Sequence, residues 1–227
     1  MFLPLDISCR QDKIVINYSL YPEQPMTNPG KHLPAEQRRA ATVDAVLALA
    51  ARLNPGKITT AAIARQMNLT QGALFRHFPN KEAIWQAVMT WVAEQLLKRV
   101  EKAARQAPGP LAGLEAMFQA HISFVVSHPG IPRMLFNELQ HPGDSAAKNL
   151  ARKLVERYRQ RLAQLIEEGQ KAGEIAPEVE AGAAAVLFVG MIQGLVVQSL
   201  LAGRPEQMQD SAPAVFALFK RGIINPQ

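Results

Sequence analysis

Residues 57–85 read KITTAAIARQMNLTQGALFRHFPNKEAIW, and this stretch decides the fold. Thr59 or Thr60 can cap a short helix that runs to Met67, because a threonine oxygen accepts hydrogen bonds from the free amides of a helix start. Asn68 follows, and asparagine tolerates the left-handed backbone conformation that a tight turn needs. The first half of the stretch therefore predicts a short helix and a turn.

The second half of the stretch predicts another short helix. Thr70 can cap this helix, which would run through Phe78. Leu74 and Phe78 are four residues apart, so both would lie on its buried side. A gap of about three residues between two short helices is typical of a helix-turn-helix. When such a unit binds DNA, its second helix enters the major groove.

Helical periodicity extends on both sides of this unit. Upstream, Pro34 can begin an amphipathic helix that ends near Asn54, with apolar residues at i, i+3, i+4 and i+7, namely Val43, Val46, Leu47 and Ala50. Downstream, helices are predicted over 81–106, 111–128, 133–140, 145–172 and 177–201, and a last helix ends near Lys220. The chain is thus predicted to be all-α, with about nine helices. A three-helix helix-turn-helix domain over 34–80 would precede a helical effector-binding and dimerisation domain over 81–227.

Positive charge is concentrated around the predicted helix-turn-helix. Residues 31–100 carry 10 Lys and Arg against 4 Asp and Glu, whereas residues 101–227 carry 13 against 12. The net charge of +6 therefore lies in the first of these segments. A polyanion is the natural partner of such a segment, and double-stranded DNA is the commonest one.

The first 33 residues differ from the rest of the chain. Prolines and a glycine interrupt any periodicity, so we expect a disordered leader, and Met26 is an alternative translation start that would leave the leader out of the native protein. The leader lacks the apolar core of a signal peptide. It contains Cys9, the only cysteine among 227 residues, so we expect no disulfide within the chain and a cytoplasmic location.

The sequence lacks the motifs of catalysis and of metal binding. It has no glycine-rich phosphate loop, no HExxH motif and no nucleophile elbow. We therefore expect that the protein is not an enzyme and binds no cofactor. His121 and His128 lie seven residues apart on one predicted helix. Metal ligands on a helix need a spacing of three or four residues and a third ligand, so no metal is expected.

A set of residues in the helix-turn-helix follows one spacing pattern, T-x-x-x-[IL]-A-x-x-x-[GN]-[LV]-[ST]-x-G-x-[LI]-[FY]-x-[HY]-F-x-[SN]-K-E-x-[IL]. Its members are Thr59 or Thr60, Ile63, Ala64, Leu69, Thr70, Gly72, Leu74, Phe75, His77, Phe78, Asn80, Lys81, Glu82 and Ile84. This pattern is the signature of the TetR family of bacterial transcriptional regulators, which residues 36–92 resemble. Asn68 stands where glycine is commonest in that family, and it satisfies the same backbone demand.

Physical reasoning about the groove assigns roles to individual residues. The N-terminal end of the second helix lies nearest the base edges, so Gln71, Gly72 and Ala73 are the residues expected closest to the bases. Gln71 and Arg76 are the predicted base readers, since glutamine pairs with adenine and arginine with guanine. The other predicted DNA-binding residues, several of them suited to phosphate oxygens, are Thr59, Thr60, Thr70, Phe75, His77 and Lys81. Further backbone or minor-groove contacts are expected from Lys31, Arg38 and Arg39. The alternative is an ordinary three-helix unit with a solvated polar face.

Residues 179–203 form the most apolar stretch of the chain. Between Ala181 and Val197 the only clearly polar side chain is Gln193, and a helix that is apolar all round must be buried on all sides. A membrane span is the less favoured alternative, because the run is short and rich in alanine. The resemblance implies that the last two helices pair with their copies in a homodimer. The predicted interface residues are Gly182, Val186, Val189, Gly190, Val197, Val215, Phe216 and Phe219.

The resemblance also implies a pocket for a small-molecule effector in the C-terminal domain, and the sequence does not show which molecule this is. Candidate residues combine apolar surface with a few polar groups: Phe118, His121, Phe124, Met134, Phe136, Phe188, Met191 and Gln193. For each residue taken singly, the alternative is an ordinary place in a helical core.

These observations predict a repressor that leaves a palindromic DNA operator when a small, largely apolar effector binds. Two alternatives stay open, namely a transcriptional activator of the same family and a helical small-molecule binding protein without a DNA function.

Overall fold

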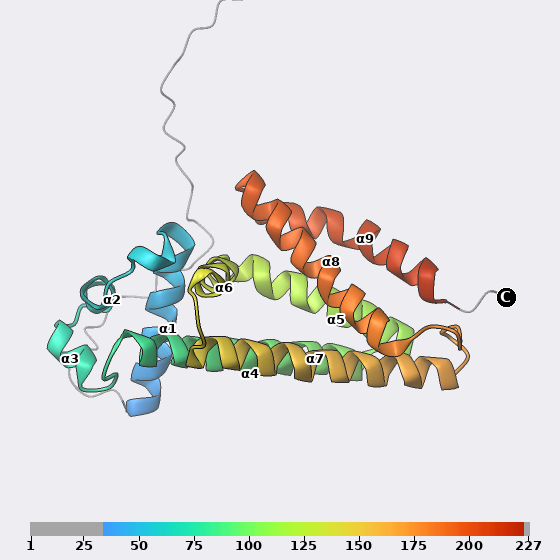
Figure 1. The fold of residues 1–227 in the computed structure, drawn as a ribbon, viewed down its shortest axis with the longest axis horizontal. Helices are drawn as coiled ribbons and strands as arrows, with labels where there is room; N and C mark the ends of the chain where they lie inside the picture. Colours follow the sequence, from blue (N-terminus) through green and yellow to red (C-terminus); the bar gives the residue numbers. More distant parts are fainter. Residues whose placement is uncertain (1–33, 225–227) are drawn as a thin grey trace, which may run out of the picture. The chain divides into compact units, whose positions relative to one another are not determined.

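The computed structural model describes residues 34–224, which form nine α-helices and one short 3₁₀ helix (Figure 1). The elements are α1 (Ala35–Arg52), η1 (Pro55–Lys57), α2 (Thr60–Gln66), α3 (Gln71–Phe75), α4 (Lys81–Gln106), α5 (Pro110–Ser127), α6 (Gly130–Gln140), α7 (Ala146–Lys171), α8 (Ala181–Ala202) and α9 (Gln207–Ile223). Within this range, β pairing is limited to one isolated bridge between Ile175 and Ile224. The all-α prediction is confirmed, while the predicted leader with Met26 and Cys9 lies outside the described residues.

Side-chain caps set the helix boundaries of the N-terminal half. The Thr59 hydroxyl accepts a hydrogen bond from Ala62 N at 3.1 Å, and the Thr70 hydroxyl accepts one from Ala73 N at 3.2 Å. Asn68, in the turn between α2 and α3, has a φ of 55°, which is the left-handed conformation expected there. The caps and the turn of the helix-turn-helix are therefore those that the sequence predicts.

Four helix boundaries differ from the predicted ones by three or more residues. α3 ends at Phe75 and not at Phe78, because the amides of His77 and Phe78 both bond to Leu74 O in a tight turn that buries the Phe78 ring. α6 begins at Gly130 and not at residue 133. Pro132 lies in the first turn, where a backbone N–H has no acceptor within the helix, so a proline there costs no hydrogen bond.

α8 begins at Ala181 and not at Pro177. The carboxylate of Glu180 accepts hydrogen bonds from the amides of Gly182 and Ala183, which makes Glu180 the N-cap. α9 continues to Ile223, three residues beyond the predicted end. By contrast, the predicted bounds of α4 are confirmed at both ends, since Asn80 caps it and Pro108 lies just beyond it.

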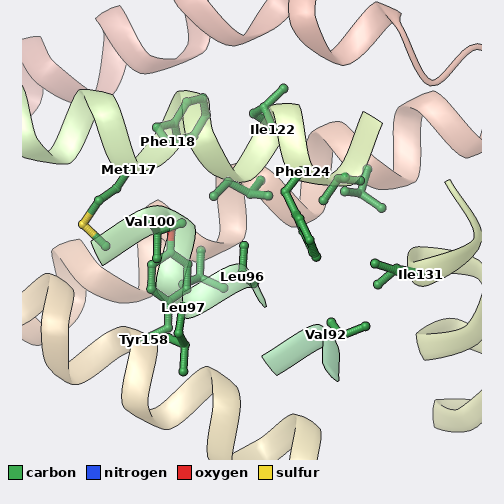
Figure 2. Packing of buried hydrophobic residues seen from close by; sticks show 14 of the residues in the cluster. Val92, Leu96, Leu97, Val100, Met117, Phe118, Ile122, Phe124, Ile131 and Tyr158 are labelled. Atoms are coloured by element: carbon green, nitrogen blue, oxygen red, sulfur yellow. The ribbon is translucent and has the colours of Figure 1, made fainter. Parts of the chain in front are cut away.

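α4 connects the helix-turn-helix to the C-terminal helices. It packs against α1 near its start and against α5 and α7 along its length (Figure 1). Figure 2 shows residues of α4 such as Leu96 and Val100 between α5, which contributes Met117, and α7, which contributes Tyr158. One apolar core therefore runs from the helix-turn-helix into the bundle.

Candidate functional site

α3 presents a short, exposed surface at one end of the described part of the chain. Leu74 points into the core, whereas Gln71, Gly72 and Arg76 are exposed and Phe75 is 41% exposed. No atom lies within 4 Å of the position that a Cβ on Gly72 would occupy, so this side of α3 is open to an approaching surface. Ala73 is half-buried, which leaves it less of the contact surface than predicted.

The side chain of Gln71 is held by a hydrogen bond to α2. Its amide nitrogen donates to the Thr60 hydroxyl at 2.7 Å, and both side chains lie at the protein surface. An exposed bond of this kind contributes about 0.5–1.5 kcal/mol at most, so it orients Gln71 without locking it. Thr60 therefore acts on α3 as well as standing at the start of α2, a relation that the spacing of the two residues did not reveal.

The C-terminal end of the helix-turn-helix is tied to α1. The Arg38 guanidinium donates to Nε2 of His77 at 2.7 Å, and His77 is half-buried against α1, not turned outward as predicted. Arg39 lies over the ring of the buried Phe78, with its guanidinium carbon 5.7 Å from the ring centre. Lys31, the third cation predicted near this helix, is outside the described residues.

Lys81 lies beside the helix-turn-helix at the start of α4. Its ammonium group is 4.8 Å from the centre of the Trp85 ring. Partial burial lowers the pKa of Lys81, and the neighbouring Glu82 carboxylate opposes that shift. The residue remains a cation whose position is fixed by the aromatic ring.

A cavity of about 610 Å³ lies among α4, α5, α6, α7 and α8. Its lining residues are mostly apolar: Met89, Val92, Leu96, Phe124, Val125, Ile131, Pro132, Leu135, Phe136, Leu139, Ala151, Leu154, Val155, Val189, Ile192, Gly194, Val196 and Val197, with His121, Tyr158, Gln193 and Gln198 as the polar members. Leu139, Val155 and Val197 are exposed, so the cavity reaches the surface of the subunit. Its volume lies within the range of about 300–1,000 Å³ that is usual for small-molecule sites.

The predicted pocket residues divide into two groups. His121, Phe124, Phe136 and Gln193 line the cavity. The other four do not: Phe118 and Phe188 pack edge to face at 5.5 Å inside the core, Met134 is buried, and Met191 is half-buried elsewhere. These four occupy the ordinary core positions that were the alternative for each residue.

Tyr158 is a cavity residue that the sequence did not single out. Helical periodicity does not distinguish a side chain that lines a cavity from one packed against a neighbour, so the spacing of Tyr158 on its helix gives no sign of this position. Its ring centre lies 5.5 Å from that of His121 on α5. Burial raises the pKa of the Tyr158 hydroxyl and lowers the pKa of His121 to about 4, so both groups are uncharged at neutral pH.

His128 occupies a structural position near the cavity. Its Nδ1 lies 2.8 Å from Phe124 O, and its ring packs against Phe124 and Trp91 at centre distances of 4.7 and 5.5 Å. Across residues 34–224, no three His, Cys, Asp or Glu side chains are grouped so that they could hold a metal ion.

The last two helices carry an exposed apolar face. On α8 this face consists of Ala183, Val186, Leu187, Gly190, Val197 and Leu201, and on α9 of Ala214, Leu218 and Gly222. Leu201 is 84% exposed and Leu218 is 66% exposed. Within residues 183–190 they recur every three or four positions, and Val197 and Leu201 continue the same side of α8 beyond the exposed Gln193, so together they form the stripe.

The structure corrects part of the predicted dimer interface. Val189, Phe216 and Phe219 lie in the core of the subunit, and Phe216 is only 1% exposed. Phe216 packs against Phe118 with a ring-centre distance of 5.4 Å, which accounts for its burial. Gly182 and Val215 are half-buried, whereas Val186, Gly190 and Val197 are exposed on the stripe.

α8 is also, among the described residues, the only helix that is long and apolar enough to cross a membrane. A single helix of this kind is weak evidence for a membrane span, since core helices of soluble proteins have the same length and composition. Burial of residues such as Phe188 and Ile192 within the subunit accounts for one side of this helix, and the exposed stripe is the side that the subunit leaves uncovered.

Two family models match the chain in consecutive segments. Residues 43–88 match the model described as bacterial regulatory proteins of the tetR family. Residues 108–197 match the model described as a tetracyclin repressor-like C-terminal domain. The two models together span more than half of the chain.

The chain is similar to curated proteins and to solved structures. The nucleoid occlusion factor SlmA of a Marinomonas species is 25% identical over 144 residues, which cover 63% of this chain and 73% of that protein. The regulator FadR of Bacillus subtilis, solved in complex with stearoyl-CoA, is 19% identical with a TM-score of 0.72, and the match covers 81% of this chain and 98% of FadR. The fatty acid degradation regulator FadR of Bacillus halodurans is 15% identical with a TM-score of 0.73, over 84% and 96% of the two chains.

Proposed function

Because the chain belongs to the TetR family of bacterial regulatory proteins, we propose that it is a ligand-released repressor that binds a palindromic operator as a homodimer. Membership of the family makes it a DNA-binding transcriptional regulator with a helix-turn-helix. The operator, the effector and the direction of regulation are the parts that we propose. We also propose that it acts in the cytoplasm and without a catalytic step, as is general for this family.

The observation that carries the DNA-binding proposal is the exposed surface of α3. Gln71 and Arg76 stand on it without burial, and the Thr70 cap fixes the start of the helix. Glutamine and arginine are the side chains that pair with adenine and guanine through two hydrogen bonds each. We assign base reading to these two residues and expect Gly72 to let the backbone approach the groove closely.

Phosphate contacts are assigned to the residues around α3. Thr59, Thr60 and Thr70 stand at the starts of α2 and α3, where hydroxyl groups and free amides suit phosphate oxygens. Lys81 adds a cation whose position is fixed by the Trp85 ring. These contacts would position the protein on DNA without reading its sequence.

The exposed stripe of α8 and α9 supports a homodimer. An exposed apolar face on two neighbouring helices is uncommon on a monomer. Pairing this face with the same face of a second subunit through a two-fold axis would bury it. The same axis would place two α3 helices on one face of a duplex, about 34–36 Å apart, as a palindromic site requires. Dimerisation and operator symmetry are therefore linked in this proposal.

The cavity supports release by a ligand. α6 contributes Ile131 and Phe136 to the cavity, and its first residue, Gly130, abuts α1, so that a Cβ there would lie 2.6 Å from Leu47 O. α4 runs from Lys81 beside the helix-turn-helix to Leu96 in the cavity wall. A ligand that moved either helix would thus change the position of the DNA-binding unit. A coupling of about 1–3 kcal/mol would lower DNA affinity roughly 5- to 150-fold.

The salt dependence of DNA binding tests this proposal. For a random-sequence duplex, we expect the logarithm of the affinity to fall linearly with the logarithm of salt concentration, with a slope of about −0.9 for each phosphate contact. A helical binding protein without a DNA function would show no binding or a flat salt response. Either result would refute the proposed function.

A further inference from the structure

Two unpartnered polar atoms mark one end of the cavity. Within residues 34–224, three buried side-chain polar atoms lack a hydrogen-bond partner: His121 Nδ1, Tyr158 OH and Arg159 Nε. The first two belong to residues that line the cavity, and Tyr158 is 2% exposed. Buried polar groups in folded proteins are nearly always hydrogen-bonded, so these two point to a ligand that bonds to them.

The polar pair lies at a defined end of the cavity. Along α4 the lining residues run from Met89 to Leu96, which spans about 10 Å at 1.5 Å per residue. α5 contributes Val125 near the α6 end and His121 further from it, since α6 follows α5 directly in the chain. Tyr158 is likewise the cavity residue of α7 that is most distant in sequence from α6. The His121–Tyr158 pair thus lies at one end of the cavity and α6 lies at the other.

The wall of the cavity carries no charged side chain. Among the described residues that line it, none is Lys, Arg, Asp or Glu. His121 and Tyr158 are uncharged at neutral pH because burial disfavours their charged forms. An ionised carboxylate or phosphate placed between them would lose its hydration without gaining an opposite charge.

We propose that the cavity binds an uncharged, largely apolar molecule with an oxygen function, such as a ketone or hydroxyl, that hydrogen-bonds to Tyr158 and His121. This inference deepens the proposed function and rests on it, because the same cavity is taken as the effector site. The hydroxyl of Tyr158 donates to the ligand oxygen, and the imidazole of His121 donates or accepts according to its tautomer. The apolar end of the molecule lies against Ile131 and Phe136 of α6, the helix that abuts α1.

Three ten-carbon probes test the proposed ligand class. Isothermal titration calorimetry of the full chain at pH 8, without DNA, compares 2-decanone, 1-decanol and decanoate, which is ionised at that pH. We expect the ketone and the alcohol to bind at least about tenfold more tightly than decanoate, since only decanoate must bury an unpaired charge. Decanoate binding as tightly as 2-decanone, or no binding of any of the three probes, would overturn the proposal.

Two variants locate the polar end. Tyr158→Phe removes one hydroxyl that has no partner in the protein, so the fold is retained, and 2-decanone should bind about three- to tenfold more weakly. The matched control, Gln160→Leu, removes an exposed polar side chain two residues further along α7 that does not line the cavity, and it should leave 2-decanone affinity unchanged. Unchanged affinity in Tyr158→Phe, or an equal loss in Gln160→Leu, would place the ligand oxygen elsewhere and overturn the assignment.

DNA binding by the same preparations separates this inference from the proposed function. If fluorescence anisotropy shows salt-dependent duplex binding while the ketone fails to bind, only the ligand class is wrong. If duplex binding itself is missing, the proposed function fails.

Discussion

Truncation of Leu218 on α9 should weaken the dimer and, through it, operator binding. Leu218 is 66% exposed in the subunit and belongs to the apolar stripe that we assign to the partner. Replacing leucine by alanine removes three carbons from a surface that would be buried on association. The subunit core, to which the neighbouring Phe216 and Phe219 contribute, should stay intact.

The expected size of the effect follows from the exposed fraction of Leu218. Burial of each carbon stabilises by about 0.8 kcal/mol, so three carbons that are two-thirds exposed in the subunit contribute up to about 1.6 kcal/mol. Two-fold symmetry brings two copies of the residue into one interface, which doubles the loss to about 3 kcal/mol. The dimer dissociation constant should therefore rise roughly two hundredfold.

Dissociation of fluorophore-labelled protein on dilution measures this constant without DNA. Leu53→Ala is the matched control, because Leu53 is also an exposed leucine, 44% exposed, but lies after α1 and far along the chain from the stripe. It should leave the dissociation constant unchanged. If Leu218→Ala dissociated no more readily than Leu53→Ala, the assignment of the α8–α9 face to the dimer would be refuted.

Four further substitutions test other parts of the account. Gln71→Ala should cost about 1–3 kcal/mol at one operator position and relax base preference there, as measured by binding to single-base variants of a selected site; unaltered preferences would remove Gln71 from base reading. Lys81→Ala should weaken binding to all sequences alike and reduce the steepness of the salt dependence by about one phosphate contact, whereas an altered base preference would contradict a phosphate role. Gly130→Ala should lower the free energy of unfolding by about 1–3 kcal/mol, because its Cβ would lie 2.6 Å from a backbone oxygen of α1. Gly72→Ala, whose Cβ would meet no atom within 4 Å and which lies on α3 away from the α8–α9 face, should instead stabilise the helix by about 0.5–1 kcal/mol, and equal urea unfolding curves for the two variants would refute the close packing of α6 on α1.

The sequence was sufficient to predict elements whose ends carry local signals. α4 begins and ends where predicted, since an asparagine cap and a proline mark its limits. α8 was placed too early, because Pro177 looked like a helix start while the Glu180 carboxylate was the actual cap. α3 is shorter than predicted, because Phe78 is buried although it lies in the turn after the helix and not in the helix itself.

The site residues were predictable only where local spacing along the chain determines which side chains are exposed. Gln71 and Arg76 are exposed as predicted, because the helix-turn-helix spacing determines which side of α3 faces outward. The cavity was predicted only in part, since an apolar side chain lines a cavity or fills a core according to its neighbours on other helices. Phe118 and Tyr158 show this, because one lies in the core and the other lines the cavity although both lie on buried faces of their helices.

The same limit applies to the dimer face. α8 is apolar on nearly all sides, so its sequence does not indicate which side meets the subunit core and which meets a partner. Val189 and Val186 were both assigned to the interface, and the structure buries the first and exposes the second.

Selection of binding sites from a random pool of duplex DNA tests the central claim most directly, namely that two copies of α3 enter successive major grooves under a two-fold axis. The account predicts an enriched palindrome whose half-sites are centred about 10–10.5 base pairs apart, or a multiple of that spacing. Enrichment of a single unrepeated half-site, or no enrichment of any sequence, would contradict it.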